Sequence, residues 1–434
     1  MISKTFSFLK PLFFSLSKKQ MPLWLIFYFL IYIVILIKWI SVHDTDTNLF
    51  LIIYGITVSF YILGNFALSY FHPLKNFNLP DDYRPLITFG VPIKNEEKVI
   101  KETLLRIAKC DYPRDKFEII AINDGSTDQT WQKMIDTKKI IKKMGVSIRL
   151  INWRKCHGKL AGLSESLKKA NGELIIFIDS DSLVEPSIIK EFVRYFKDET
   201  IGGVSGRTFV ANANKNVLTK MQVGFYFLSY SVYKAAESIF GTVTCCPGCC
   251  SAYRKEYLAG ILEEWAKLNT TKFTYVDDRN LTNFVLRKRY HTVYAPKAIA
   301  HTYVPEDFRT FFRQQLRWTR SWFLESILAS KFMWQRNIVM GLIFYLGLIL
   351  QLLAPIMVFR ALFIFPFIEK SLPYYYIFGV LLMAIISAIY YQLRTSKNSY
   401  SPYVFLFPLL YTFVLVWQIP YAIATLGDSR WGNR

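Results

Sequence analysis

The apolar residues of this chain are gathered into long runs at both ends, with a polar stretch between them. Runs near residues 22–41 and 49–71 come first, and further runs lie near 337–368, 373–392 and 402–426. Each is close to or longer than the roughly 20 residues that a helix needs to cross the hydrocarbon core of a bilayer. The sequence therefore predicts a multi-pass membrane protein with one substantial soluble domain between two sets of membrane helices.

Positive charge surrounds these runs. The formal net charge is +21, which in a soluble chain would first indicate nucleic-acid binding. Here Lys and Arg flank the apolar runs, and the short connection around Asp44 and Asp46 carries neither. Because basic residues favour cytoplasmic loops, we expect this connection outside the cell and the central domain in the cytoplasm, below the plasma membrane. No recognition motif accompanies the charge, so we expect no nucleic-acid partner.

The pattern along the chain predicts four regions. Residues 1–75 hold two transmembrane helices, and residues 80–302 a soluble α/β domain. Residues 303–335 mix aromatic residues with arginines and should form amphipathic helices at the membrane interface. Residues 336–434 form a C-terminal membrane region, in which the run at 337–368 could be one span with a tail or two short spans.

Short apolar runs alternate with amphipathic stretches in the central domain. The runs at 86–92, 117–122, 146–151 and 174–178 look like buried strands with helices between them. This alternation is typical of an α/β sheet, whose ligands bind at the carboxyl ends of the strands. Polar motifs follow three of the runs, at Lys94-Asn95-Glu96, Asn123-Asp124-Gly125-Ser126 and Asp179-Ser180-Asp181.

Asp179 and Asp181 flank Ser180 directly after an apolar run. Two carboxylates at a strand end can share one Mg²⁺ or Mn²⁺, with diphosphate oxygens in the remaining positions. Such a metal would neutralise the charge that develops on a leaving nucleoside diphosphate. Asp-Ser-Asp is also a common turn, and its place after a buried strand is what favours the metal site.

Asp124 and Lys159 are candidates for contacts to a nucleotide. A carboxylate before glycine at a strand edge suits uracil or ribose, and the same segment could also cap the next helix; both can hold together. Lys159, in His157-Gly158-Lys159, could touch the nucleotide as well. The alternative is an exposed lysine at a helix start.

An acidic pair, Asp277 and Asp278, lies late in the central domain. Transfer of a sugar to a hydroxyl group needs a base, which is typically worth ~10² to 10⁴ in rate. One of two adjacent carboxylates can serve while the other is held, for example by Arg279. As an alternative, Asp277 could simply cap a helix.

Two further motifs are Gln314, Arg317 and Trp318 at helical spacing, and the cysteine-rich segment 245–250. An indole can stack on a sugar ring, and guanidinium and amide groups can bind phosphate or hydroxyls, although a tryptophan here could also be an ordinary interfacial anchor.

Four of the six cysteines lie in 245–250, a spacing that could hold zinc. No second Cys or His cluster accompanies them, and a cytoplasmic domain keeps thiols reduced.

Taken together, these residues resemble the membrane-integrated, processive family 2 glycosyltransferases, which include hyaluronan, rhizobial chitooligosaccharide, chitin and cellulose synthases. The resemblance covers nearly the whole chain. It implies a GT-A domain inserted between N- and C-terminal transmembrane helices, and an inverting transfer from a UDP-sugar. It implies the following roles: Asp124, Lys159 and Arg317 at the donor, Asp179 and Asp181 at the metal, Asp278 as general base, and Gly248, Cys249, Gln314 and Trp318 at the acceptor.

The motifs divide between two branches. Two motifs are similar to hyaluronan synthases, Asp277-Asp278-Arg279-x-Leu281-Thr282-Asn283 and the terminal Trp431-Gly432-Asn433-Arg434. The second similarity implies that Trp431 and Arg434 gate the active site. The cysteine-rich loop and Gln314-Gln315-Leu316-Arg317-Trp318 are closer to chitooligosaccharide synthases. Val276 and Asn433 depart from the hyaluronan synthase motifs, which have glycine and threonine there.

We therefore expect a processive synthase that builds a β-linked, GlcNAc-containing glycan from UDP-GlcNAc and UDP-GlcA, with the growing chain and the bilayer as its partners. The first alternative is chitin-type synthesis from UDP-GlcNAc alone. A transporter or channel is a second, but the apolar runs carry few of the ionisable groups that such a protein places at the midplane. A polyprenyl-phosphate glycosyltransferase would share the Asp-x-Asp fold without Gln314-x-x-Arg317-Trp318.

Overall fold

A computed structural model describes residues 21–43, 49–72, 83–268, 278–395 and 398–427. The contacts within it divide the chain into two compact units, which we describe separately. The smaller unit contains residues up to Leu63 together with Ile356–Val414, and the larger contains Gly64–Pro355 together with the residues from Leu415 onward.

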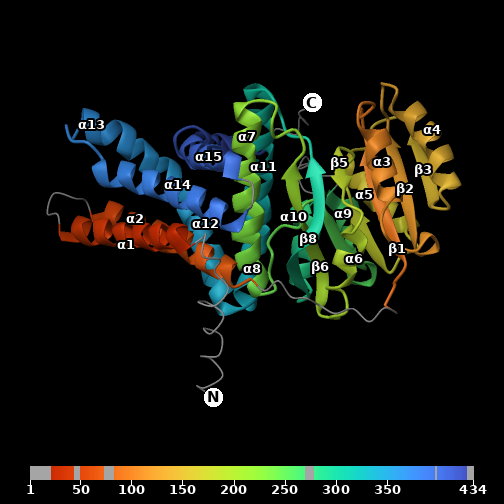
Figure 1. The fold of residues 1–434 in the computed structure, drawn as a ribbon, viewed down its shortest axis with the longest axis horizontal. Helices are drawn as coiled ribbons and strands as arrows, with labels where there is room; N and C mark the ends of the chain where they lie inside the picture. The colour runs from red at the N-terminus through yellow and green to blue at the C-terminus, as the bar shows by residue number, and fades with distance from the viewer. Residues whose placement is uncertain (1–20, 44–48, 73–82, 269–277, 396–397, 428–434) are drawn as a thin grey trace, which may run out of the picture. The chain divides into compact units, whose positions relative to one another are not determined.

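The larger unit is built on a mixed eight-stranded sheet with the order β3-β2-β1-β4-β7-β6-β8-β5 (Figure 1). The first four strands are parallel, β7 runs antiparallel between β4 and β6, and β8 is parallel to β6. The strands are β1 (Ile87–Ile93), β2 (Phe117–Asp124), β3 (Ser147–Trp153), β4 (Leu174–Phe177), β5 (Ser182–Val184), β6 (Ile201–Val210), β7 (Ser251–Arg254) and β8 (His291–Thr302).

All four strands predicted from the apolar runs are present, but one was assigned the wrong environment. β1, β2 and β4 are buried along their whole length. In β3 only Ile148 is buried, and the other residues are exposed or partly exposed. The reason is its position at the edge of the sheet, where it pairs with β2 alone.

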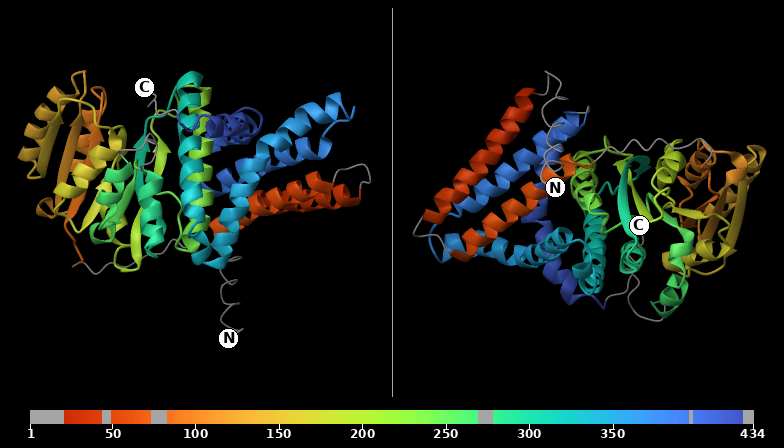
Figure 2. Two further views of the ribbon diagram at one scale, coloured as in Figure 1. Left: turned by 180° about the vertical axis from the view of Figure 1, so that it is seen from behind. Right: turned by 90° about the horizontal axis from the view of Figure 1, so that it is seen from below.

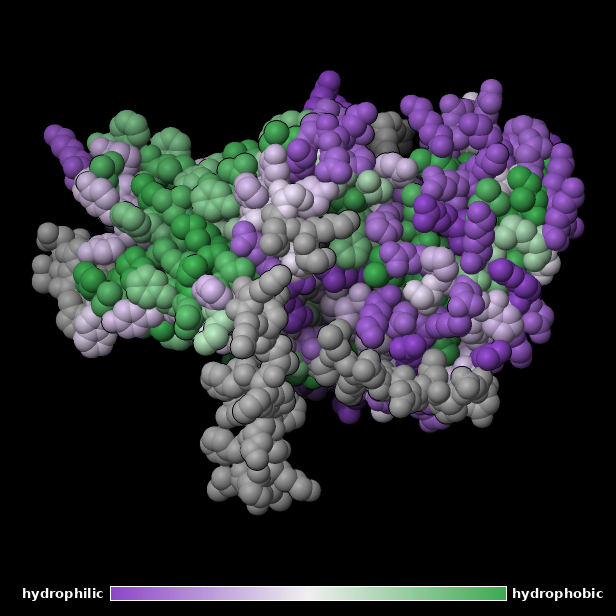
Figure 3. All heavy atoms as spheres, in the orientation of Figure 1, coloured by the Kyte–Doolittle hydropathy of each residue, from purple (hydrophilic) through white to green (hydrophobic). Residues whose placement is uncertain are grey.

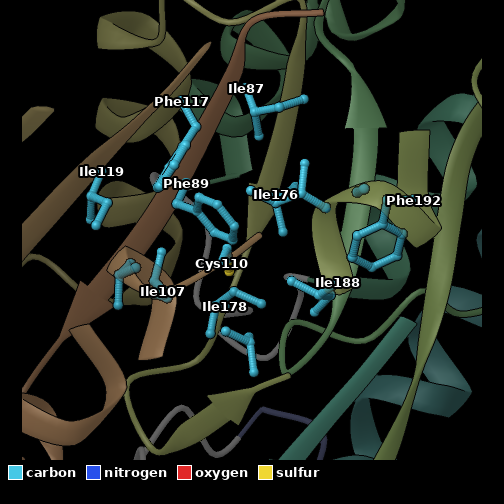
Figure 4. Close-up of a cluster of buried hydrophobic side chains, with 14 of the residues drawn as sticks. Ile87, Phe89, Ile107, Cys110, Phe117, Ile119, Ile176, Ile178, Ile188 and Phe192 are labelled. Atoms are coloured by element: carbon cyan, nitrogen blue, oxygen red, sulfur yellow. The ribbon is translucent and has the colours of Figure 1, made fainter. Parts of the chain in front are cut away.

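Helices cover both faces of the sheet. Because side chains alternate along a strand, Ile176 of β4 points to one face while Ile175 and Phe177 point to the other. Figure 4 shows the first face, where Phe89 and Ile176 pack with Ile107 of α3 and with Phe192 of α6. These helices are α3 (Ile100–Ala108) and α6 (Ile188–Val193); α4 (Thr130–Lys143), α5 (Lys159–Lys169), α9 (Ile261–Leu268) and α10 (Asp278–Arg287) complete the α/β core.

Two long helical segments run side by side beside the sheet (Figures 1 and 2). One is α7 (Val217–Phe227), which continues through a π-helical turn (Leu228–Lys234) into α8 (Ala235–Ile239). The other is α11 (Phe308–Ser330), which begins where the Asp307 carboxylate accepts a hydrogen bond from Thr310 N at 2.9 Å. α11 lies within the region 303–335, whose position at the membrane interface remains a prediction, and the paired segment α7–α8 was not predicted.

Five of the described helices are long and apolar enough to cross a membrane. They are α1 (Met21–His43), α2 (Leu49–Tyr70), the continuous 30-residue stretch Ile338–Phe367, α14 (Tyr374–Arg394) and the segment Ser401–Ala424. Figure 3 shows hydrophobic residues covering the visible face of α1, α2 and α14. These helices match the expected flanking apolar segments, and they are typical of a multi-pass membrane protein.

Two apolar segments have internal irregularities. Ile338–Phe367 consists of α12 (Ile338–Phe359), a π-helical turn (Arg360–Ile364) and α13 (Phe365–Phe367), so it is one continuous helix rather than two short spans. Ser401–Ala424 is divided into α15 (Ser401–Phe413), a 3₁₀ turn (Leu415–Trp417) and α16 (Gln418–Ala424). Within the smaller unit, α1 packs on α14 through Phe27 and Tyr390, whose ring centroids are 5.8 Å apart.

Candidate active site

Three charged residues from separate motifs meet at the carboxyl edge of the sheet. Lys159 is the first residue of α5, Asp179 follows β4, and Asp278 is the first residue of α10. The Lys159 Nζ lies 2.9 Å from Asp179 Oδ1 and 3.4 Å from Asp278 Oδ1. The three side chains are between 17% and 31% exposed, so they form a partly shielded ionic cluster that is open to solvent.

Gly248 lies against this cluster. Its N–H donates a hydrogen bond to Asp278 Oδ2 at 2.6 Å, and its carbonyl accepts one from Asp179 N at 2.9 Å. A Cβ at this position would lie 2.7 Å from Asp278 Oδ1, 2.9 Å from Lys159 Nζ and 3.0 Å from Asp179 Oδ1. Gly248 therefore lets the main chain of the cysteine-rich loop fix the orientation of the Asp278 carboxylate.

Asp181 is held more deeply than Asp179. It is 7% exposed, and its Oδ1 accepts a hydrogen bond from Thr302 Oγ1 of β8 at 3.4 Å. Carboxylate oxygens are the hard donors that Mg²⁺ and Mn²⁺ prefer, so Asp179 and Asp181 fit such an ion. Among the residues that the structure describes, no cluster of three or more His, Cys, Asp and Glu side chains could hold a metal.

The Asp124 carboxylate is engaged with the loop that leads into Lys159. It is 3% exposed, and its oxygens accept hydrogen bonds from His157 N at 2.6 Å and Gly158 N at 2.9 Å. Gly158 has a φ of 90°, a left-handed conformation that glycine adopts without steric cost. Asp124 thus shapes the turn that places Lys159. The capping alternative concerned the helix that follows Asp124 in sequence, whereas these hydrogen bonds go to the loop before α5. A uridine contact remains a prediction.

The thiol of Cys249 is buried among side chains of the core. The Sγ lies 3.1 Å from Thr208 Oγ1 and 3.3 Å from the Tyr230 hydroxyl. Burial raises the pKa of Cys249 to about 12, so the thiol is neutral and unsuited to nucleophilic or metal-binding chemistry. Any acceptor contact at this position would come from its main chain.

The remaining motif residues lie on α11. The Trp318 ring stacks on Phe225 of α7, with centroids 5.7 Å apart and 17° between the planes. Among the described residues, the Gln314 Oε1 is a buried acceptor that has no hydrogen-bond partner. An unpaired buried polar atom costs about 1–3 kcal/mol, and a ligand hydroxyl could remove this cost.

Some predicted residues cannot be placed, and others were missed. Asp277, Trp431 and Arg434 lie outside the described residues. Sequence reasoning missed Thr302, which holds Asp181, and Tyr230, which holds Cys249; neither carries a distinctive sequence signal. It also missed the buried Glu325 of α11, although a lone acidic residue in an aromatic and apolar stretch was an available signal.

The chain is similar to proteins named N-acetylglucosaminyltransferase and hyaluronan synthase over most of its length. It is 28% identical over 366 residues to an N-acetylglucosaminyltransferase of Rhizobium meliloti (strain 1021), covering 82% of this chain and 83% of that protein. It is 27% identical over 395 residues to a hyaluronan synthase of Streptococcus pyogenes serotype M1, covering 88% and 90%. A match to an N-acetylglucosaminyltransferase of Azorhizobium caulinodans, at 29% identity, spans 62% of that protein.

A solved structure supports the predicted fold. The mannosyltransferase PcManGT from Pyrobaculum calidifontis, in complex with GDP-Man and Mn²⁺, superimposes with a TM-score of 0.53 at 19% identity, covering 88% of this chain and 99% of that one. This likeness confirms that the sheet and its helices form a GT-A-like domain.

The family described as glycosyltransferase like family 2 matches residues 85–321, the part of the chain that holds the ionic cluster, Gly248 and the α11 motif. This match covers more than half of the 434 residues, so the protein belongs to glycosyltransferase family 2 and is a glycosyltransferase with apolar helices on both sides of its catalytic domain.

Proposed function

We propose that the protein is a membrane-embedded synthase that polymerises a β-linked, GlcNAc-containing glycan from UDP-sugars, with UDP-GlcNAc as one donor and UDP-GlcA as the other. The proposal rests mainly on the ionic cluster. In it, Lys159 lies next to Asp179 of the predicted metal site and next to Asp278, the predicted base. Relatives named N-acetylglucosaminyltransferase and hyaluronan synthase, both matched over more than 80% of this chain, support GlcNAc transfer.

Asp278 acts as the base in this proposal. The acceptor hydroxyl attacks the anomeric carbon of the donor sugar, the bond from that carbon to the diphosphate breaks, and UDP leaves with the electron pair. The hydroxyl proton passes to Asp278, whose Oδ2 is oriented by Gly248 N–H and whose Oδ1 faces Lys159. Pre-orientation of a base in this way lowers the barrier to proton transfer.

Asp179, Asp181 and Lys159 form the donor side. An Mg²⁺ or Mn²⁺ ion held by the two carboxylates would neutralise charge on the diphosphate. Lys159 would contact the same diphosphate, with Arg317 of α11 as a second cation. Asp124 orders the loop before Lys159 and lies close to where a uridine would bind at the strand edge.

Gln314 and Trp318 form the acceptor side. The unpaired Gln314 Oε1 can accept a hydrogen bond from a sugar hydroxyl, and the Trp318 indole offers an apolar face beside Phe225. Together with the main chain at Gly248 and Cys249, they would hold the terminal sugar of the growing chain near Asp278. Trp431 and Arg434 would close the site over the donor.

We further propose that the catalytic domain faces the cytoplasm across the plasma membrane. The basic residues that flank the apolar segments support this orientation, because the connection around Asp44 and Asp46 has no Lys or Arg. The polymer would then leave through the membrane helices as it grows.

Product analysis tests the proposal and separates its alternative. Purified full-length protein in lipid nanodiscs should convert radiolabelled UDP-GlcNAc to polymer only when UDP-GlcA is added, and hyaluronidase should degrade the product. Polymer from UDP-GlcNAc alone, degraded by chitinase, would establish the chitin-type reaction, which the cysteine-rich loop favours. If neither mixture released UDP nor formed polymer, the proposed function would be wrong.

A further inference from the structure

A buried network of polar side chains joins α10 to α11. Glu325 of α11 is 1% exposed, and its Oε2 accepts a hydrogen bond from Asn283 Nδ2 at 2.7 Å. Its Oε1 accepts a longer one from Asn280 Nδ2 at 3.4 Å. The Asn283 amide also donates to the main-chain carbonyl of Glu325 at 3.1 Å. Both asparagines belong to α10, so two side chains of this helix donate hydrogen bonds to a single carboxylate of α11.

Trp265 fixes the direction of these hydrogen bonds. Its Nε1, which can only donate, gives a hydrogen bond to Asn280 Oδ1 at 2.9 Å. The amide nitrogen of Asn280 must therefore face Glu325. Trp265 is fully buried and belongs to α9. The hydrogen bonds therefore connect α9, α10 and α11, and the donor and the acceptor of each are determined.

A buried carboxylate is an unfavourable way to hold two helices together. Burial raises the pKa of Glu325 to about 7, with Arg279 of α10 and Glu264 of α9 as the charged groups that act on it. Apolar residues of similar volume would often hold such a contact at least as firmly. A fully paired polar network instead specifies one relative arrangement of its members, because any slip leaves a buried group unpaired.

The two helices carry the two halves of the proposed chemistry. α10 begins at Asp278, the proposed base, and Asn280 and Asn283 lie within its first two turns. α11 carries Gln314 and Trp318. Glu325 lies seven residues after Trp318, which places it on the same side of the helix about 10 Å further along the axis.

We infer that Glu325 is a positioning residue that sets Asp278 relative to the acceptor side of the site. This inference rests on the proposed function, which makes Asp278 the base and places the acceptor against α11. Among the described residues, the hydrogen bonds of the Glu325 side chain go to Asn280 and Asn283 and none goes to the ionic cluster. Loss of its pairing should therefore lower kcat and leave the KM for UDP-GlcNAc nearly unchanged.

The polarity of the network allows a swap that tests the pairing. In Glu325→Gln the new amide nitrogen must face one of the asparagine amide nitrogens, donor against donor. In Asn280→Asp two carboxylates face each other. In the double variant Asn280→Asp/Glu325→Gln, the introduced carboxylate can accept hydrogen bonds from both Trp265 and the introduced amide nitrogen. The oxygen of that introduced amide accepts from Asn283, so every group is paired again.

Kinetics on the purified full-length protein should show this pattern. Each single variant should lose about tenfold in kcat with UDP-GlcNAc, and the double variant should return to within about threefold of wild type, as expected for directly coupled residues. Asp307→Asn is the matched control, because it removes a carboxylate from the start of the same helix and asparagine caps a helix equally well. It should have wild-type kcat.

Melting temperatures keep the test decisive if a single variant folds poorly. The double variant should melt above both single variants. The inference would be overturned if Glu325→Gln had wild-type kcat. It would also be overturned if the double variant were no better than the worse single variant in both kcat and melting temperature. If wild type itself makes no polymer, the proposed function fails, while the melting temperatures still decide whether this network pairs as described.

Discussion

Gly248 shows how one small residue can decide the geometry of a site. A Cβ there would press on all three members of the ionic cluster at 3.0 Å or less, so the main chain can reach Asp278 only because no side chain intervenes. The nearby Asp124 has a similar indirect role, because its carboxylate holds the loop before Lys159. Both residues act by placing other groups.

Gly248→Ala should reduce transfer about 100-fold, because displacement of a reacting group by about 1 Å can cost that much. Steady-state kinetics on the purified variant would measure it. Gly64→Ala is the matched control, since a Cβ at Gly64 meets nothing within 4 Å and should leave activity unchanged. Full activity of Gly248→Ala would mean that the cluster tolerates rearrangement.

Asp278→Asn should abolish transfer while UDP binding persists, because the proton acceptor is lost and the donor side is kept. Asp181→Asn should instead weaken UDP binding together with its dependence on Mg²⁺ or Mn²⁺. Calorimetric titration with UDP, in the presence and absence of EDTA, distinguishes the two variants. An Asp278→Asn enzyme near wild-type rate would remove this residue from the role of base.

Glu325 should make stability depend on pH. Its pKa is raised from 4.5 to about 7, chiefly by burial, so in that interval the folded state binds a proton that the unfolded state has released. Stability must then fall as pH rises from about 4.5 to 7, by up to about 3 kcal/mol. The melting temperature of wild type should decline relative to Glu325→Gln across this interval, and a constant difference would contradict the raised pKa.

At the scale of elements, α7–α8 and α11 form a pair that carries the proposed acceptor side. Each begins with a side-chain cap, Asn216 with a capping box for α7 and Asp307 for α11, so both start points are fixed locally. The two helices then meet through Phe225 and Trp318. Arg320 of α11 donates a hydrogen bond to Thr425, just beyond α16, at 2.7 Å, which ties the last described helix to the same element.

Trp318→Ala should reduce elongation far more than donor binding, because it removes the indole face that we assign to the acceptor. Trp318→Phe should retain most of the activity, since a ring remains to stack on Phe225 and on a sugar. Trp334→Ala serves as the control for membrane anchoring, because Trp334 is 67% exposed. Polymer length and UDP affinity are the measurements. Normal elongation by Trp318→Ala with weakened membrane attachment would favour the anchor interpretation.

At the scale of the whole molecule, the apolar segments pose a question of topology. Five complete crossings would place the two ends of the chain on opposite faces of the membrane. α15 has 13 residues, a length of about 20 Å, against a hydrocarbon core of about 30 Å. Helix breaks of this kind are tolerated in a membrane where the protein shields the backbone, so we expect the segment Ser401–Ala424 to re-enter and return to the face of the catalytic domain.

Cysteine labelling in intact cells should locate the two faces. An impermeant maleimide added outside should label Asp46→Cys and should not label Gly427→Cys until the cells are permeabilised. The tie between Arg320 and Thr425, which keeps the end of α16 with the catalytic unit, is the physical reason. External labelling of Gly427→Cys would defeat both the re-entrant segment and the proposed gating by Trp431 and Arg434.

The sequence by itself determined the features that depend on local patterns. Apolar runs of membrane length, strands such as β1 and β4, and the carboxylates after them follow from hydrophobic periodicity and turn chemistry, which a short window of residues contains. For the same reason an α/β sheet and its flanking apolar helices could be expected in advance, whereas the GT-A assignment came from the resemblance of the motifs to family 2 glycosyltransferases. The partial exposure of β3 could not be expected, because an edge position depends on the strand order of the complete sheet.

Only the tertiary structure decided how distant residues meet. Lys159 and Asp278 are 119 positions apart, and they touch because the sheet order brings the start of α5 and the start of α10 to one edge. The buried thiol of Cys249, the backbone bonds of Asp124 and the Glu325 network have the same origin. No local pattern specifies them, since each side chain is paired and buried by elements that its own neighbours in sequence do not determine.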